Sequence, residues 1–153
     1  MYKKILLPTD GSEHAEKAEK HALFLADKTG AEIIALSVVE NSYFVGLPSD
    51  DTIFHVNEML KKETEKNLEK VEKMKEEVES DVKITLSVEE GSPADVILDT
   101  IDKENIDLVI IGSSGKSGFD RLIMGSVADK VVKVAKCSVL VVHWNIFNFI
   151  SFL

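Results

Sequence analysis

Short apolar runs recur along this chain, each bounded by turn-forming or charged residues. A run in which nearly every position is apolar predicts a strand buried on both faces, as in the middle of a parallel sheet. The run at residues 82–88 instead alternates apolar and polar positions, so it predicts a half-exposed strand near a sheet edge. The five expected strands are residues 4–8, 32–39, 82–88, 108–111 and 139–142.

Between these runs, apolar and small residues recur at the three- to four-residue spacing of an amphipathic helix. In the longest stretch, 52–80, mixed lysine and glutamate residues fill the other side and predict a solvated face. The third helix has a start signal: Ser92 as the N-cap, Pro93 in the first turn and Asp95 as a capping-box acid. Residues 41–51 have no period and predict a loop. The four expected helices are residues 13–29, 52–80, 93–103 and 127–135.

Strands alternate with helices throughout. That order predicts a single-domain α/β fold: an open, mainly parallel five-stranded sheet, Rossmann-like, with helices on both faces. Ligands of such sheets bind beyond the carboxyl ends of the strands, where the strand order reverses. Segments 8–10, 38–40 and 112–115 lie at the carboxyl ends of expected strands. We expect the first and the last of them to flank one crevice.

The last of these segments is rich in glycine. Gly112 and Gly115 follow the strand at 108–111, and nine residues later Gly125 and Ser126 precede the last expected helix. Glycines let the backbone approach an anion closely, and the free N–H groups of a helix start point at it. The pattern predicts a nucleotide-binding site, and the alternative is that these glycines only form turns.

Commoner motifs are excluded by spacing. The segment 112–117 has two residues, not four, between its first glycine and the Gly-Lys-Ser that would complete a P-loop. There is no Gly-x-Gly-x-x-Gly, and no nucleophile elbow with a Ser–His–Asp set. His14 and His21 lie two helical turns apart, roughly 10 Å, which is too far to share a metal ion. We therefore expect no metal site built from protein ligands alone.

Composition narrows the class of partner. The 153 residues are 44% hydrophobic, which suits one domain with a substantial core. A formal charge of -9 argues against nucleic acid as the main partner, because phosphate backbones select basic surfaces. Neither a signal peptide nor an apolar run of about 20 residues is present, so the expected location is the cytoplasm. The single cysteine, Cys137, is expected to be a small core residue.

Several motifs in order resemble the universal stress protein family. The Gly-x-x-Gly, nine residues and Gly-Ser pattern precedes the apolar run 138–142, residues 3–12 are similar to the family's opening strand and turn, and residues 91–93 match a recurrent Gly-x-Pro. The resemblance covers about residues 2–142. It implies an adenine-nucleotide alpha-hydrolase-like α/β fold. The family contains members that bind ATP and members that do not, and the complete glycine motif found here marks the binders.

The resemblance also implies a role for each part of the site. Asp10 contacts the nucleoside near the ribose, where its carboxylate accepts hydroxyl hydrogen bonds, with Pro8 and Thr9 on the same side, and Val38 contacts adenine. The alternatives are that Asp10 caps the first helix and that Val38 is ordinary core. Lys116 neutralises phosphate charge or points to solvent. The phosphate end comprises Gly112, Ser113, Ser114, Gly115, Lys116, Gly125, Ser126 and Val127.

Binding does not imply catalysis. Hydrolysis requires a group that positions water, and the sequence offers no general base near the expected γ-phosphate, so no catalytic residue is assigned. The resemblance therefore implies an ATP-binding sensor or switch with slow hydrolysis at most. Any Mg²⁺ or Mn²⁺ would accompany the nucleotide, held largely by phosphates and water. A phosphoryl- or nucleotidyl-transfer enzyme is a further alternative.

A second class of function is a non-catalytic interaction protein. Family members usually form homodimers through the last strand, and the apolar run 138–142 would otherwise be an exposed edge. The tail 144–153 departs from the family, since it is mostly apolar and holds the only tryptophan and three of the seven phenylalanines. We expect a domain at 1–143 and a tail that packs within an oligomer, or else on its own domain or on a membrane surface.

Overall fold

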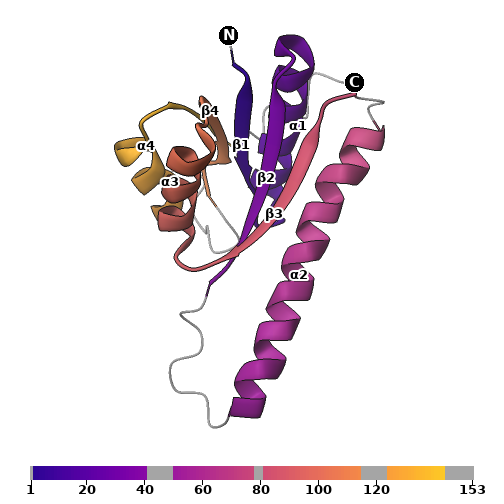
Figure 1. Cartoon of the computed structure of the whole chain (residues 1–153), viewed down its shortest axis with the longest axis vertical. Coiled ribbons are helices and arrows are strands. Elements are labelled where there is room, and N and C mark those ends of the chain that lie inside the picture. The colour runs from indigo at the N-terminus through magenta and orange to yellow at the C-terminus, as the bar shows by residue number, and fades with distance from the viewer. Residues whose placement is uncertain (1, 41–49, 78–80, 115–123, 144–153) are drawn as a thin grey trace.

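The computed structural model describes residues 2–40, 50–77, 81–114 and 124–143. Within them, strands and helices alternate as the sequence predicted, which confirms the α/β class (Figure 1). The calls on residues 41–49, 78–80, 115–123 and 144–153 lie outside the described residues. The elements are β1 (Lys4–Pro8), α1 (Glu13–Thr29), β2 (Glu32–Val39), α2 (Asp50–Glu77), β3 (Ile84–Glu90), α3 (Pro93–Glu104), β4 (Leu108–Gly112), α4 (Ser126–Val134) and β5 (Ser138–Val142).

The five described strands form one sheet in the order β3-β2-β1-β4-β5. Each neighbouring pair is parallel, so the expected parallel sheet is confirmed. β3 lies at an edge, as its alternating pattern predicted. The chain moves from β1 toward one edge, then crosses back and continues from β4 toward the other. The strand order therefore reverses between β1 and β4, where a ligand crevice is expected.

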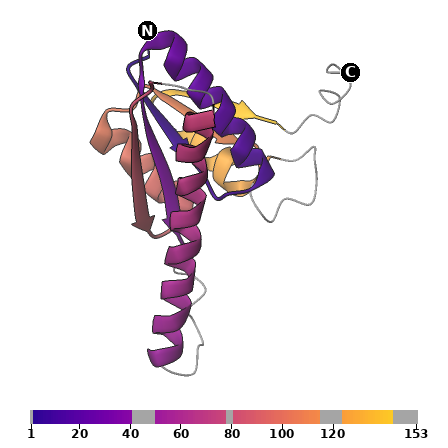
Figure 2. The same ribbon diagram turned by 90° about the vertical axis from the view of Figure 1, so that its right-hand side faces the viewer.

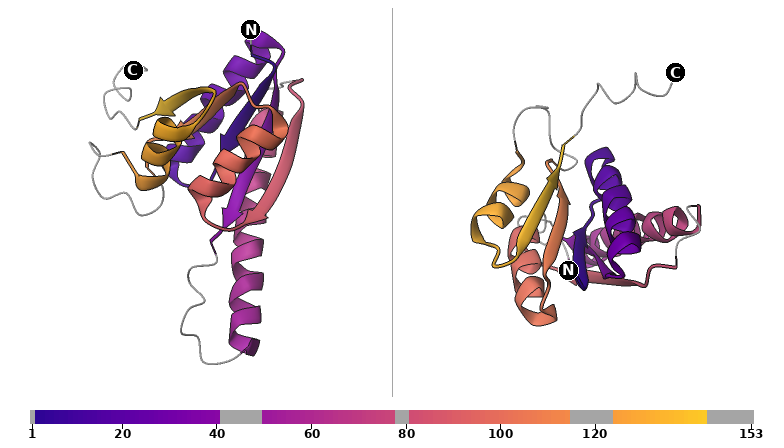
Figure 3. Two further views of the ribbon diagram at one scale, coloured as in Figure 1. Left: turned by 60° about the vertical axis from the view of Figure 1, so that its left-hand side comes forward. Right: turned by 90° about the horizontal axis from the view of Figure 1, so that it is seen from above.

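Helices cover both faces of the sheet, as expected. α1 and α2 lie on one face, and α3 and α4 lie on the other (Figure 3). Right-handed crossovers explain this division, because the direction of travel across the sheet differs before and after β3.

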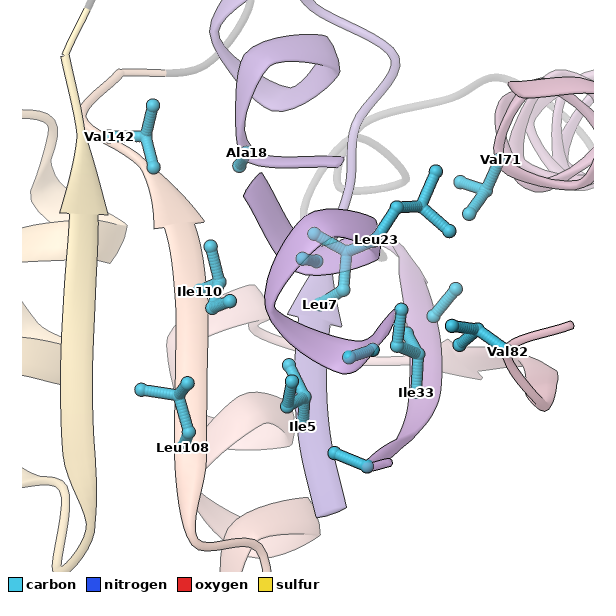
Figure 4. Packing of buried hydrophobic residues seen from close by; sticks show 14 of the residues in the cluster. Ile5, Leu7, Ala18, Leu23, Ile33, Val71, Val82, Leu108, Ile110 and Val142 are labelled. Carbon is cyan, nitrogen blue, oxygen red and sulfur yellow. The ribbon is translucent and has the colours of Figure 1, made fainter. Parts of the chain in front are cut away.

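The central strands are apolar at every position because both of their faces are buried. Ile5 and Leu7 belong to the core beneath α1 and α2, whereas Leu6 belongs to the core beneath α3 and α4. All three are fully buried. Figure 4 shows the first core, in which Leu23 of α1 and Val71 of α2 pack toward the sheet. Burying such side chains stabilises the fold by about 1.5–3 kcal/mol each.

α2 covers the sheet with only part of its length. It begins at residue 50, and its N-terminal half projects past the carboxyl ends of the strands (Figure 2). Leu68 and Val71 are buried against the sheet, but Phe54 and Met59 on the projecting half are 61% and 72% exposed. The apolar stripe that the sequence shows along this helix is thus buried mainly in the C-terminal half.

Two local expectations differ from the structure. β3 begins at Ile84 rather than Val82 and extends to Glu90, because β2 supplies pairing partners up to Val39. Ser92 is the N-cap of α3, as predicted, but its side chain makes no capping hydrogen bond. Asp95 instead forms an ion pair with Lys130 of α4. Lys130 and the Ser92 hydroxyl lower the pKa of Asp95.

α1 starts against the end of β4. β1 and β4 share only the register pairs Ile5↔Leu108 and Leu6↔Val109. A Cβ at Gly112 would lie 2.8 Å from the backbone carbon and 2.9 Å from the oxygen of His14. Gly112 therefore allows the first turn of α1 to approach the sheet. Helix packing is thus one structural use of this glycine, and its expected contact with a ligand stays a prediction.

Gly112→Ala is expected to lower the free energy of unfolding by about 1–3 kcal/mol, because the added methyl group has no space beside the His14 backbone. Urea denaturation followed by circular dichroism measures the change. The matched control is Ser138→Ala, an exposed position on the neighbouring strand β5, with an expected change within about 0.5 kcal/mol. Equal stability of the Gly112→Ala variant and the wild type would contradict the close approach.

Candidate functional site

A cavity of about 460 Å³ lies at the carboxyl ends of β1, β2 and β4. The two segments expected to flank a crevice were 8–10 and 112–115. Their described residues, 8–10 and 112–114, line the cavity together, so that prediction is confirmed over the described residues. Gly115 and Lys116 lie outside the described residues. The sequence-predicted site residues that line the cavity are Pro8, Thr9, Asp10, Val38, Gly112, Ser113, Ser114, Gly125, Ser126 and Val127.

The turn between β1 and α1 forms one end of the cavity. Oδ1 of Asp10 accepts a hydrogen bond from the Ser12 backbone N–H at 3.0 Å, and Oγ of Ser12 accepts one from the Ala15 N–H at 3.2 Å. Ser12 is therefore the N-cap of α1, and the alternative that Asp10 caps this helix is wrong. Asp10 shapes the turn and lines the cavity.

Gly11 lets α2 approach this turn. Its φ of +72° is in the left-handed region, and a Cβ there would collide with the side-chain amide of Asn67. Asn67 is 7% exposed and lines the cavity. The turn and α2 thus meet through a polar side chain at the edge of the site.

Apolar side chains also line the cavity. Val38 is one of them and also packs against the core beneath α3 and α4, while its contact with adenine stays a prediction. Leu36, Ile97 and Ile111 lie on the same wall. A flat aromatic group is the kind of ligand that such walls accommodate.

The N-terminus of α4 also lines the cavity. Gly125 is the N-cap and Ser126 is the first helical residue, so the helix begins one residue before the expected start at 127. The Gly125 N–H donates to the Ser113 carbonyl at 2.7 Å, which joins the two halves of the glycine motif. The first N–H groups of a helix have no intrahelical acceptor, and here those of Ser126 and Val127 stand at the cavity.

The charged side chains among the described lining residues are all acidic: Asp10, Glu40 and Glu63. An anion held by this part of the chain would therefore depend on backbone N–H groups and the positive end of the α4 dipole. Three or more potential metal ligands gather nowhere within residues 2–40, 50–77, 81–114 and 124–143. No helix in those ranges is long and apolar enough to cross a membrane.

Sequence reasoning missed the contribution of α2. Leu60, Glu63, Thr64 and Asn67 all line the cavity. Thr64 and Asn67 are buried and lie on the stripe that continues to Leu68. Polar residues inside an otherwise apolar stripe were a usable signal, because a helix exposes polar groups on the buried side only where they find partners or a ligand.

A second missed residue lies behind the β1–α1 turn. Glu19 of α1 is 1% exposed, and its Oε1 accepts a hydrogen bond from the Thr9 hydroxyl at 2.7 Å. Its other carboxyl oxygen, Oε2, has no hydrogen-bond partner in the described part of the protein. Burial raises the pKa of Glu19, and the Thr9 hydrogen bond partly opposes that rise.

The fold and the cavity define the class of protein. It is an open, doubly wound α/β domain with a crevice, lined by polar and apolar residues, where its strand order reverses. The model of the universal stress protein family matches residues 1–143, and the chain belongs to that family.

Individual relatives agree over nearly the whole chain. Universal stress protein MJ0531 of Methanocaldococcus jannaschii is 45% identical over 142 residues, which cover 93% of this chain and 82% of that protein. The solved structure of MJ0577 from the same organism is 34% identical with a TM-score of 0.77, covering 95% of this chain and 98% of that one. UspA from Lactobacillus plantarum is 26% identical with a TM-score of 0.81, covering 93% and 98% respectively.

Glu19 is expected to make stability depend on pH. Its pKa in the folded protein is raised above the ordinary 4.5, so the folded state retains a proton that the unfolded chain has released. The stability that this proton confers is fully present below about pH 4.5 and is lost as pH rises through the raised pKa. Glu19→Gln is expected to remove this loss, so its stability relative to wild type increases with pH.

Denaturant unfolding at a series of pH values measures this difference. Asp27→Asn is the matched control, because Asp27 is a half-exposed acid on the same helix that pairs with Lys28 at its surface. A wild-type pH dependence that persists unchanged in Glu19→Gln would show that Glu19 is not its source.

Proposed function

We propose that this protein is an ATP-binding universal stress protein that acts as a nucleotide-dependent sensor or switch, with slow hydrolysis at most. The observation that carries the proposal is that one cavity is lined by the Asp10 carboxylate, by apolar side chains and by the first residues of the α4 helix. A nucleotide presents hydroxyl groups, a flat base and phosphates in the same combination.

In this proposal, each part of the cavity holds one part of the nucleotide. Asp10 accepts hydrogen bonds from ribose hydroxyls, with Pro8 and Thr9 beside it, and Val38 contacts adenine. The phosphates lie on the glycine motif and at the N-terminus of α4. The proposed phosphate residues are Gly112, Ser113, Ser114, Gly115, Lys116, Gly125, Ser126 and Val127.

Structures of other family members support an adenine nucleotide as the ligand. A universal stress protein solved in complex with cAMP shares 22% identity and a TM-score of 0.59 with this chain. A family member from Arabidopsis thaliana solved with AMP bound shares 19% identity and a TM-score of 0.67. At these identities the likeness is one of fold, so the choice of ATP rests on the glycine motif of this chain.

The proposed role is regulatory because no residue of the site is assigned as a general base. Glu40 and Glu63 line the cavity, but nothing places either of them beside a terminal phosphate. A divalent ion such as Mg²⁺ or Mn²⁺ would be held mainly by the phosphates and water, since the described residues gather no cluster of three potential ligands.

The first test is to denature the purified protein, separate the soluble fraction and identify any released nucleotide by chromatography and mass spectrometry. Calorimetry with Mg-ATP on nucleotide-free protein then gives the affinity. Asp10→Ala is expected to weaken binding by about 10- to 100-fold, because hydrogen bonds to a charged group are worth about 1.5–3 kcal/mol.

Asp27→Ala is the matched control, since Asp27 is a half-exposed acid on α1 that pairs with Lys28, and its affinity should equal that of the wild type. A wild type that releases no nucleotide and gives no heat with Mg-ATP would refute ATP binding. Intact ATP in near-stoichiometric amount would favour a switch over an enzyme.

A second candidate function is that of a dimeric interaction protein. β5 is the last strand of the sheet, and its residues Val139, Leu140 and Val141 are only partly buried. Val132 and Val134 of the adjoining helix α4 are 43% and 54% exposed. A two-fold pairing of β5 with its mate would cover this edge and the neighbouring apolar surface.

Val134→Lys is expected to shift a homodimer toward the monomer, because a lysine charge would be placed in an apolar interface. Light scattering over a dilution series measures the mass. Met59→Lys is the control: Met59 is 72% exposed on α2, so this change should leave the mass unaltered. A monomeric wild type at all concentrations would remove the dimer proposal.

A further inference from the structure

A buried glutamate supports the turn that carries Asp10. We propose that Glu19 is a positioning residue for the nucleoside end of the cavity, which it controls by holding Thr9 and, through Thr9, the turn that presents Asp10. The inference rests on the proposed function, because it assigns to Asp10 the contact with the nucleoside.

One hydrogen bond connects Glu19 to this turn, and two more hold the turn itself. Oε1 of Glu19 accepts from the Thr9 hydroxyl at 2.7 Å, and the same hydroxyl oxygen accepts from the Gly11 N–H at 3.3 Å. One residue further, the Ser12 N–H donates to Oδ1 of Asp10 at 3.0 Å. Thr9 is also fixed from the other side, because its N–H donates to the Leu36 carbonyl of β2 at 2.8 Å. Loss of the Glu19 acceptor would therefore loosen the turn and not the sheet.

The location of Glu19 argues against a role in packing alone. It lies on the buried stripe of α1 beside Ala15, Ala18 and Ala22, with 1% of its surface exposed. Burying a carboxyl group costs free energy unless its oxygens are paired, and Oε2 is unpaired in the described structure. An apolar side chain of similar size would be expected to stabilise the fold at this point. What the carboxyl supplies, and an apolar side chain does not, is the acceptor for Thr9.

The charged groups around Glu19 influence whether its carboxyl group is protonated. Glu16 on its own helix and Asp10 in the turn oppose the charge of an ionised Glu19, and Lys70 of α2 favours it. The ammonium group of Lys70 lies 3.5 Å from the Gly11 carbonyl oxygen, on the same turn.

The site is consequently expected to respond to pH. When Glu19 is protonated its side chain is neutral, and the turn keeps the closed arrangement in which Glu19 is buried and bonded to Thr9. When the proton leaves to solvent, the charge on Oε2 has no donor, so opening of the turn to water becomes more favourable. A nucleoside that requires the closed turn should then bind more weakly as pH rises. Glu19→Gln keeps an acceptor for Thr9 and cannot ionise, so its affinity should not follow this dependence.

Calorimetry with adenosine tests the inference between about pH 5.5 and about pH 8.5, because adenosine has no phosphate whose own titration would intrude. Glu19→Leu removes the acceptor and is expected to weaken binding by about tenfold, equivalent to about 1.4 kcal/mol. Glu19→Gln is expected to stay within about threefold of the wild type at low pH and to show a flatter pH profile. Asp27→Leu, at a half-exposed acid further along α1, is the matched control for affinity and its pH profile and should match the wild type. Glu16→Leu, at the exposed acid one turn away, is the control for the exchange measurement.

A measurement without ligand separates this inference from the proposed function. Amide hydrogen exchange at Gly11 and Ser12 is expected to accelerate in Glu19→Leu, and to remain at the wild-type rate in Glu19→Gln and Glu16→Leu. Circular dichroism melts confirm that each variant is folded. If Glu19→Leu does not fold, Thr9→Val removes the same hydrogen bond from its donor side and should produce the same exchange.

The outcomes are distinct. A wild type that binds neither adenosine nor ATP refutes the proposed function, and the amide exchange then decides whether Glu19 holds the turn. A wild type that binds adenosine, together with unchanged affinity and unchanged Gly11 and Ser12 exchange in Glu19→Leu, overturns the positioning role. A pH profile that is identical in the wild type and Glu19→Gln overturns its link to protonation.

Discussion

The short pairing between β1 and β4 is the constraint on which the rest of this structure depends. The two strands share register pairs only at Ile5↔Leu108 and Leu6↔Val109. The residues that follow these pairs in each strand lead to the cavity. Because the strand order reverses here, right-handed crossovers place α1 and α2 on one face and α3 and α4 on the other. The first turn of α1 lies against β4, where Gly112 provides space beside the His14 backbone.

The cavity combines an acidic surface with donors supplied by the backbone. The described lining residues that carry charge are all acidic, in keeping with the net charge of -9. Anion binding within the described part of the cavity therefore depends on the first residues of α4, Ser126 and Val127, which line it together with the acidic side chains. The bond from the Gly125 N–H to the Ser113 carbonyl fixes the start of α4, because it ties this helix to the residue that follows strand β4.

Buried polar residues mark positions where the requirements of the candidate binding site lower the stability of the fold. Thr64 and Asn67 interrupt the buried stripe of α2, and Glu19 interrupts that of α1. Each would be an apolar residue if packing were the only requirement. Asn67 lies against the turn at Gly11 and Glu19 bonds to Thr9 in the same turn, so both helices contribute to the site as well as covering the sheet.

The sequence by itself determined the α/β class, the alternation of elements and the edge position of β3, because apolar periodicity directly reflects how many faces of an element are buried. It also placed residues 8–10 and 112–114 at one crevice, since parallel strands end at the same edge of a sheet. Only the tertiary structure decided that Ser12, not Asp10, caps α1, because both residue types favour N-caps and the sequence does not show at which residue the helix begins. It likewise decided the roles of Gly112, Asn67 and Glu19, since each depends on a partner distant in the chain or on burial that periodicity did not reveal.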